Sequence, residues 1–286
     1  MNDIVRRTGL EAALQRLCQS HTGPSPCVIS LAETRRLAQE FGQSPRQVEL
    51  IALYARVLPQ RYARNLGTVG WEGQCRLLEA CVAVIGCGGL GGWIAEGLAR
   101  MGVGRLILVD GDCFAEDNLN RQLGCTERTL GKPKVAVLAE RLAEVNAATE
   151  VIGHQVYLTE ENGMALLTGA NVVVDALDNM PSRFTLHRAA AALELPVVHG
   201  AIGGYTGQVM TVLPGDAGLV ALYGERDVPE RGIEKQLGNP SATPMMISAW
   251  QIQEVVKLIV RQGQLLRNRM LLLDAESGEV SEIRLD

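Results

Sequence analysis

Cysteine is missing from more than half of this 286-residue chain. All seven cysteines lie between Cys18 and Cys125, and no two of them are spaced as C-x-x-C. A tetrathiolate zinc site built from paired cysteines is therefore not expected. An odd, scattered set of thiols also argues against a disulfide framework and predicts reduced cysteines in the cytoplasm.

Long apolar runs and a strong net charge are also absent. No run approaches the roughly 20 apolar residues that a membrane-spanning helix needs. The segment around Asp3, Arg6 and Arg7 lacks the apolar core of a signal peptide. The net charge of −5 disfavours a surface that binds nucleic acid throughout. We therefore expect a cytoplasmic protein without membrane contact.

The charge is unevenly distributed along the chain. Residues 1–64 hold nine arginines and five acidic residues (+4), which leaves 18 basic and 27 acidic residues (−9) for the remainder. The body of the protein therefore favours a neutral or cationic partner, and nucleic acid is not an expected partner.

The first 59 residues predict a helical N-terminal extension, followed by one larger domain over 60–286. Ser30 is placed to cap a helix over 31–41 that Gly42 ends, and Pro45 opens a second helix to about residue 57. We expect the extension to dock on the larger domain or on a partner subunit.

DNA reading is an alternative role for this extension. Ala38, Gly42 and Val48 have the spacing of a helix-turn-helix, and the local charge is positive. Acidic Glu40 and Glu49 flank the turn, however, which favours docking over DNA binding.

From residue 79 onward, buried strand patterns alternate with helical ones. Continuous β-branched runs between helices indicate strands covered on both faces, hence a mostly parallel sheet. The expected strands are 81–86, 105–110, 151–156, 171–176 and 196–200, with helices at about 90–101, 131–147 and 181–194. Stretches 206–213, 270–274 and 279–285 predict antiparallel strands, and a long helix is expected over 243–262. The fold class is α/β, with a Rossmann-like sheet that continues into antiparallel strands.

A glycine loop follows the first strand of this sheet. Glycines at a strand-to-helix turn let the backbone approach a phosphate and point helix N-terminal amides at it. Asp110, at the end of the next strand, suits a ribose hydroxyl. The loop glycines expected to contact the nucleotide are Gly86, Gly88, Gly89 and Gly91. Together these features predict a nucleotide site.

Cationic and amide side chains behind the loop favour chemistry on the phosphates. Arg121 and Lys134 are placed to bind a triphosphate, and Asp178, just beyond a buried strand, is the expected Mg²⁺ ligand. An NAD-dependent dehydrogenase is the alternative that a glycine loop alone would allow. Its catalytic histidine or Tyr–Lys pair is not evident.

The ordered motifs resemble one family. They are Arg61-Tyr62-Ala63-Arg64-Asn65, Gly86-Cys87-Gly88-Gly89-Leu90-Gly91, Asp110-Gly111-Asp112, Asn118-Leu119-Asn120-Arg121-Gln122, Gly131-Lys132-Pro133-Lys134, Asn146 and Asp175-Ala176-Leu177-Asp178-Asn179. From about residue 60 the chain resembles the HesA/MoeB/ThiF family, bacterial relatives of the ubiquitin-activating enzymes. The resemblance implies a homodimeric, ATP- and Mg²⁺-dependent adenylyltransferase. Its implied reaction is adenylation of the C-terminal glycine of a ubiquitin-like sulfur carrier ending in Gly-Gly, with release of pyrophosphate.

The resemblance also implies roles for individual residues. Asn118 and Arg121 would bind phosphates, Lys134 the α-phosphate side, and Asn179 would line the same pocket as Asp178. Arg64 matches an arginine that reaches from one subunit into the partner's active site, where it would act as an arginine finger.

Two departures from the family pattern concern cysteine. The usual zinc site needs two C-x-x-C pairs in the C-terminal half, so no zinc is expected here. The loop at about 224–243 also lacks the cysteine that bonds covalently to the carrier in some relatives. The predicted product is thus an acyl-adenylate, intercepted by a separate sulfur donor.

Several assignments stay open at this point. The carrier of a molybdenum or tungsten cofactor pathway, or of a thiamine pathway, would fit equally. Adenylation of a modified tRNA base or of a peptide is an alternative reaction. A nucleotide-sensing regulator with a helix-turn-helix is an alternative from another class of protein.

Overall fold

The computed structural model describes residues 3–19, 26–224 and 234–285. Eight strands form one sheet in the order β10-β9-β8-β7-β6-β3-β4-β5. The strands are β3 (Cys81–Ile85), β4 (Arg105–Val109), β5 (Glu150–His154), β6 (Val172–Asp175), β7 (Val197–Gly203), β8 (Thr206–Val212), β9 (Arg269–Asp274) and β10 (Glu279–Arg284). Pairing is parallel from β5 to β7 and antiparallel from β7 to β10. The predicted α/β fold class is confirmed.

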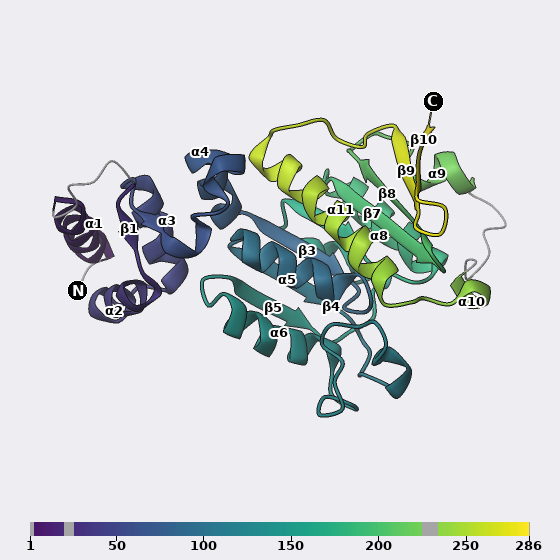
Figure 1. The fold of residues 1–286 in the computed structure, drawn as a ribbon, viewed down its shortest axis with the longest axis horizontal. Helices are drawn as coiled ribbons and strands as arrows, with labels where there is room; N and C mark the ends of the chain where they lie inside the picture. Colours follow the sequence, from purple (N-terminus) through teal and green to yellow (C-terminus); the bar gives the residue numbers. More distant parts are fainter. Residues whose placement is uncertain (1–2, 20–25, 225–233, 286) are drawn as a thin grey trace.

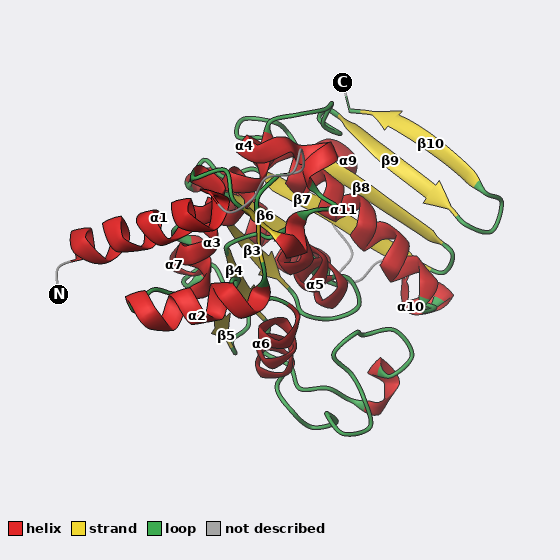
Figure 2. Ribbon diagram, turned by 60° about the vertical axis from the view of Figure 1, so that its left-hand side comes forward, coloured by secondary structure: helices red, strands yellow, loops and turns green. Residues whose placement is uncertain are grey.

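Helices cover both faces of the sheet, as Figures 1 and 2 show. One face packs on α5 (Gly91–Met101), α6 (Lys134–Val145) and α11 (Ala242–Val260), and the other on α7 (Gly163–Leu167) and α8 (Met180–Ala192). Short helices α9 (Leu219–Tyr223) and α10 (Glu234–Leu237) and the 3₁₀ turn η2 (Glu116–Asn118) lie in connections. No described helix has the length and apolarity needed to cross a membrane.

Three helices make up the N-terminal part: α1 (Asp3–Gln19), α2 (Leu31–Phe41) and α3 (Pro45–Tyr54). Helix α2 has the predicted bounds because Ser30 forms a capping box with Glu33 and Gly42 takes the left-handed conformation. Helix α3 ends three residues earlier than predicted. The chain after it forms β2 (Leu58–Pro59), which pairs with β1 (Val28–Ile29).

A buried polar network joins this N-terminal part to the body. Tyr62, in the 3₁₀ turn η1 (Gln60–Tyr62), donates its hydroxyl to Glu49 Oε2 at 2.9 Å, and the Nδ2 of Asn146 donates to the Tyr62 hydroxyl at 3.1 Å. Arg61 forms an ion pair with Glu49 (3.3 Å) and also donates to Asn146. Three of the motif residues after position 60, Arg61, Tyr62 and Asn146, thus form the network that holds the extension in place.

Helix α3, which would be the recognition helix of a DNA-binding module, packs at the same interface between the extension and the body. Arg46 donates to the backbone oxygens of Leu78 (3.0 Å) and Glu79 (3.3 Å), at the end of α4 (Leu66–Glu79). Glu49, on the same helix α3, is 1% exposed. In Figure 1 the three helices lie beyond α4, on the side where β3 begins. This arrangement favours docking over DNA reading.

Candidate functional site

The glycine loop lies between β3 and α5, at the carboxyl end of β3. Gly86 has φ +95°, and a Cβ added there would lie 2.5 Å from the backbone oxygen of Ala176. A Cβ on Gly91 would lie 1.8 Å from the backbone oxygen of Gly86. Leu90 precedes α5 and provides no side-chain cap. No side chain caps the start of α5, where the Gly92 amide donates to the Gly88 backbone oxygen at 3.2 Å, so an anion would have to bind the neighbouring amides of Gly91 and Trp93. The close contacts at Gly86 and Gly91 exclude larger side chains from the loop.

Asp110 follows β4, the strand beside β3, and is tied to the glycine loop. Its Oδ2 accepts the amide of Cys87 at 2.7 Å, and its Oδ1 accepts the amide of Asp112 at 2.8 Å. Burial raises the pKa of Asp110, against the opposing effects of Lys134 and of these amides. The two amides fix the Asp110 carboxylate beside the glycine loop.

The segment 118–122 folds back over the loop. A Cβ on Gly89 would lie 3.8 Å from Cγ of Arg121, so this arginine lies against the glycine backbone. Its Nη1 donates to the Asp117 oxygen and to Asn120 Oδ1, both at 2.8 Å. Asn118 is 8% exposed, and its Oδ1 accepts the amide of Ala115 at 3.2 Å, which stabilises the η2 turn.

Lys134 is the first residue of α6 and is 6% exposed. Its Nζ lies 2.9 Å from Asp112 Oδ2, so this buried side chain has a carboxylate partner. Burial alone would raise the pKa of Asp112, but hydrogen bonds from Tyr157 and Lys134 outweigh it and lower this pKa. A phosphate could take the place of the Asp112 carboxylate as the partner of Lys134.

Asp178 and Asn179 lie between β6 and α8, next to the glycine loop because β6 pairs with β3. Asn179 caps α8 by accepting the amide of Ser182 at 2.9 Å, and its Nδ2 donates to Asp178 Oδ1 at 3.2 Å. The cap is thus Asn179, which leaves the exposed Asp178 carboxylate available. A solvated carboxylate is the type of ligand Mg²⁺ takes when it keeps waters and binds phosphates.

A buried ionic cluster behind this edge was not predicted. Arg183 donates to Asp175 Oδ2 (3.2 Å), His199 Nδ1 lies 2.7 Å from the same oxygen, and His187 Nε2 lies 3.6 Å from it. Burial alone would raise the pKa of Asp175, but Arg183 and the two histidines outweigh it and hold this pKa well below its usual range. Burial lowers the pKa of His199 to about 4.

This cluster is mostly buried, with the His187 side chain 11% exposed. Asp175, His187 and His199 have ligand atoms within 4.8 Å of one another, but the Arg183 guanidinium already neutralises the carboxylate. His199 is 0% exposed, so its imidazole is held inside the fold and is not at the surface of the site. The sequence carries only a partial signal, an arginine five residues after Asp178 and a histidine at a strand end, and no local pattern places the two together.

A cavity of about 550 Å³ opens beside Asn120. Its lining comes from the β7–β8 turn, the end of α10 with the segment before α11, the β9–β10 turn and the middle of the 118–122 segment; it includes Asn120, Gly204, Tyr205, Leu237, Asn239 and Glu276. Asn120 Nδ2 donates to the Asn239 backbone oxygen at 3.1 Å and closes one side. Of the connection before α11, residues 225–233 lie outside the described residues.

Arg64 lies far from this edge in its own chain. It is exposed, and its neighbour Asn65 donates to the backbone oxygen of Met101, the last residue of α5. The glycine loop precedes the first residue of the same helix. A helix of 11 residues spans about 16 Å, so Arg64 and the glycine loop lie at opposite ends of α5.

Comparison with known proteins identifies the family. A profile of the ThiF family matches residues 62–286. The chain belongs to the ThiF family. It is 34% identical over 220 residues to the SAMP-activating enzyme E1 of Haloferax volcanii, covering 75% of this chain and 81% of that protein. It is 35% identical over 224 residues to the sulfur carrier protein adenylyltransferase of Thermus thermophilus, covering 75% and 83%.

The chain spans about half the length of another group of relatives. The adenylyltransferase and sulfurtransferase MOCS3 of Anopheles gambiae is 35% identical over 229 residues, which are 79% of this chain and 52% of that protein. The family resemblance and the prediction of an enzyme of the adenylyltransferase type are both confirmed.

Solved structures share the fold. Escherichia coli MccB superposes with a TM-score of 0.69 at 20% identity, covering 79% of this chain and 69% of that one. Its complex with MccA-N7isoASN gives 0.68 at 17% identity, covering 99% and 86%. The AMP complex of E. coli tRNA N6-threonylcarbamoyladenosine dehydratase gives 0.61 at 21%, covering 71% and 95%.

Proposed function

We propose that this ThiF-family enzyme uses ATP to adenylate the C-terminal glycine of a small ubiquitin-like sulfur carrier. The proposal is carried by one observation: Arg121, Lys134 and Asp178 lie at the same edge of the sheet as the glycine loop, which leads into a helix without a side-chain cap. Two relatives named for SAMP activation and sulfur-carrier adenylation support the acceptor. Sulfur transfer for a molybdenum, tungsten or thiamine-type cofactor is the corresponding context.

The chemistry is a displacement at the α-phosphorus of ATP. A carboxylate oxygen of the carrier forms a bond to that phosphorus, the bond to the bridging oxygen breaks, and pyrophosphate leaves with its electrons. Gly89 and the first amides of α5 would hold phosphate oxygens, and Asp110 would hold the ribose. Arg121 and Lys134 would supply fixed positive charge where negative charge develops.

Magnesium fits the same edge. Asp178 would hold it, with Asn179 keeping that carboxylate oriented through the 3.2 Å hydrogen bond. When bound, Mg²⁺ would neutralise charge on the departing pyrophosphate. We also propose that Asn118 shapes the phosphate side by fixing the η2 turn, since its own oxygen already accepts the Ala115 amide.

We further propose a homodimer in which Arg64 serves the partner's site. Arg64 is exposed, yet the length of α5 separates it from the glycine loop of its own chain. An arginine finger in trans would explain an exposed arginine on a segment held by the buried Arg61–Glu49 pair. Residues 1–59 act in this scheme as a docking extension.

The cavity beside Asn120 would receive the tail of the carrier. It borders the 118–122 segment, so a chain end lying in it would lead toward the α-phosphate. No cysteine follows Cys125, and Cys87 is buried with a pKa raised by burial well above its usual range. The proposed product is therefore a carrier acyl-adenylate, passed to a separate sulfur donor.

Exchange of labelled pyrophosphate into ATP tests the proposal. We expect exchange that depends on a Gly-Gly carrier and that Asp178→Ala and Arg121→Ala abolish, while Glu11→Gln, in an exposed ion pair of α1, leaves it unchanged. Full exchange in both active-site variants would contradict the assigned roles.

A second candidate is adenylation of another carboxylate. The fold likeness to the MccB complex extends over 99% of this chain, including the N-terminal helices, whereas the sulfur-carrier relatives align over 75–79%. The charge of −9 on residues 65–286 disfavours a tRNA, so a peptide is the alternative acceptor that remains. ATP consumption stimulated by a peptide but not by any carrier would establish this alternative.

A further inference from the structure

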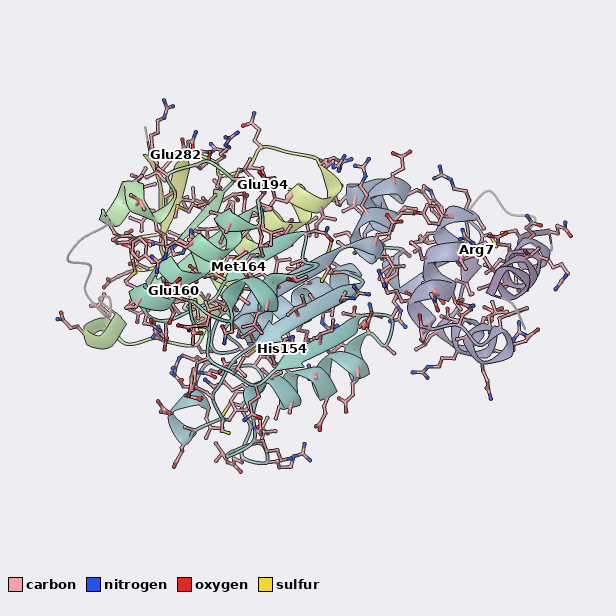
Figure 3. The ribbon with its side chains drawn as sticks, turned by 180° about the vertical axis from the view of Figure 1, so that it is seen from behind. Arg7, His154, Glu160, Met164, Glu194 and Glu282 are labelled. Atoms are coloured by element: carbon pink, nitrogen blue, oxygen red, sulfur yellow. The ribbon has the colours of Figure 1, made fainter. Side chains whose placement is uncertain are left out.

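Three adjacent strand ends define how a nucleotide would lie. In the order β6-β3-β4-β5, the glycine loop follows β3 and Asp110 follows β4. A nucleotide with its phosphates on the loop and its ribose at Asp110 would direct its base over the ends of β4 and β5. His154, labelled in Figure 3, is the last residue of β5. The residues just after His154 therefore lie where the base of such a nucleotide would be.

Tyr157 lies at that position and is unusually exposed for an aromatic residue, at 67%. A Cβ added to Gly111 would lie 2.8 Å from each of three carbon atoms of its ring. Three equal distances mean that one ring face lies over Gly111, next to Asp110. The absence of a side chain at Gly111 is what allows this stacking.

The hydroxyl of Tyr157 is anchored as well. It donates to Asp112 Oδ1 at 2.7 Å, while Asp112 Oδ2 accepts from Lys134 Nζ at 2.9 Å. One carboxylate therefore holds both the exposed ring and the lysine proposed for the α-phosphate. An aromatic ring held at both ends loses little further freedom when a ligand stacks on it.

We propose that Tyr157 is the base platform of the nucleotide site, stacking on the purine ring of ATP. The proposal rests on the nucleotide part of the proposed function and adds the residue that recognises the base. Stacking on an aromatic ring depends on the π-face of a base, so it tolerates different bases. Purines, with the larger face, are expected to bind more tightly than pyrimidines.

Nucleotide affinity measured by calorimetry, in the full chain with Mg²⁺, tests the platform. Tyr157→Ala should raise the Kd for ATP about 5- to 100-fold, the range expected for a lost base–aromatic stack. Tyr157→Phe keeps the ring and should stay within about threefold of the original Kd. Gly111→Ala, which displaces the ring, should also weaken ATP binding.

Tripolyphosphate separates base recognition from phosphate recognition. Because it has no base, its Kd should be the same in Tyr157→Ala and in the unchanged chain. The matched control is Tyr54→Ala, since Tyr54 is also an exposed tyrosine (56%) that donates to an acid, Glu79, but lies on α3. It should leave both affinities unchanged.

Two results would overturn the platform. One is an ATP Kd for Tyr157→Ala within about twofold of the original; the other is an equal loss of tripolyphosphate affinity. Failure of the proposed function looks different, because the unchanged chain would then bind ATP without carrier-dependent pyrophosphate exchange. If the unchanged chain did not bind ATP, both proposals would be wrong.

Discussion

The buried Glu49 carboxylate should be the main polar determinant of how the N-terminal extension holds to the body. It is 1% exposed, accepts the Tyr62 hydroxyl at 2.9 Å and pairs with Arg61 at 3.3 Å. Burial raises the pKa of Glu49, against the opposing effects of Arg61 and Tyr62. Glu49→Ala would leave the Tyr62 hydroxyl without its acceptor and Arg61 without its carboxylate partner.

The loss of unfolding free energy expected for Glu49→Ala follows from the burial of the Glu49 carboxylate. Removing one partner of a buried pair destabilises by about 3–5 kcal/mol. Since the Arg61 side chain is 22% exposed and can be partly solvated, we expect the lower end, about 3 kcal/mol. Glu49→Gln keeps the size and one acceptor oxygen and should cost about half as much. A Glu49–Tyr62 double-mutant cycle with Tyr62→Phe should give a coupling of about 1 kcal/mol or more.

Urea unfolding followed by circular dichroism measures these free energies. Glu40→Ala is the control in the same extension, because Glu40 forms an exposed i,i+4 pair with Arg36, with side-chain exposures of 49% and 58%. Such pairs contribute about 0.3–0.5 kcal/mol. If Glu49→Ala and Glu40→Ala differed by less than about 0.5 kcal/mol, the extension would not be held by this network.

Three further predictions concern the site. Asp178→Ala should lower kcat for adenylation about 100-fold or more while leaving the melting temperature unchanged, because the carboxylate is exposed; a small loss of kcat would refute its role. Gly91→Ala should weaken ATP binding at least about tenfold and cost about 1–3 kcal/mol of stability, since its Cβ would lie 1.8 Å from the Gly86 oxygen; unchanged calorimetric Kd would contradict this. The pKa of His199 is about 4 in the folded chain, below the ordinary 6.5. The stability that the neutral His199 contributes to the fold is therefore fully present above about pH 6.5 and is lost as the pH falls toward 4. The loss should reach about 3 kcal/mol, and urea unfolding of His199→Gln should show a weaker pH dependence; equal dependence would refute the assignment.

Local signals explain where the fold could be predicted. The helix at 31–41 carries its own start and stop, in Ser30 and Gly42, and the structure has the predicted bounds. Helix α4 was not predicted because Gly67, Gly70 and Gly73 lower helix propensity over 14 residues. Tertiary packing against α11 determines the structure of this segment: a Cβ on Gly73 would lie 2.8 Å from the side chain of Val260 on α11.

The candidate site likewise has some residues whose positions could be predicted from the sequence and others whose positions could not. Asp110, Arg121, Lys134 and Asp178 follow strands or glycines in a recognisable order, so their positions at one edge could be anticipated. The Asp175–Arg183–His199 cluster and the stacking of Tyr157 on Gly111 could not, because they depend on neighbouring strands meeting at that edge. No local pattern distinguishes an exposed tyrosine on a loop from one that lies over a nucleotide site.

The central claim is adenylation of a carrier by this chain. Intact-mass spectrometry of a Gly-Gly carrier, after incubation with the chain, ATP and Mg²⁺, tests it most directly. The account predicts a carrier species heavier by one adenylyl group, absent with Asp178→Ala and absent for a carrier lacking its terminal glycine. An unmodified carrier in the presence of a chain that binds ATP, across a panel of candidate carriers, would contradict it.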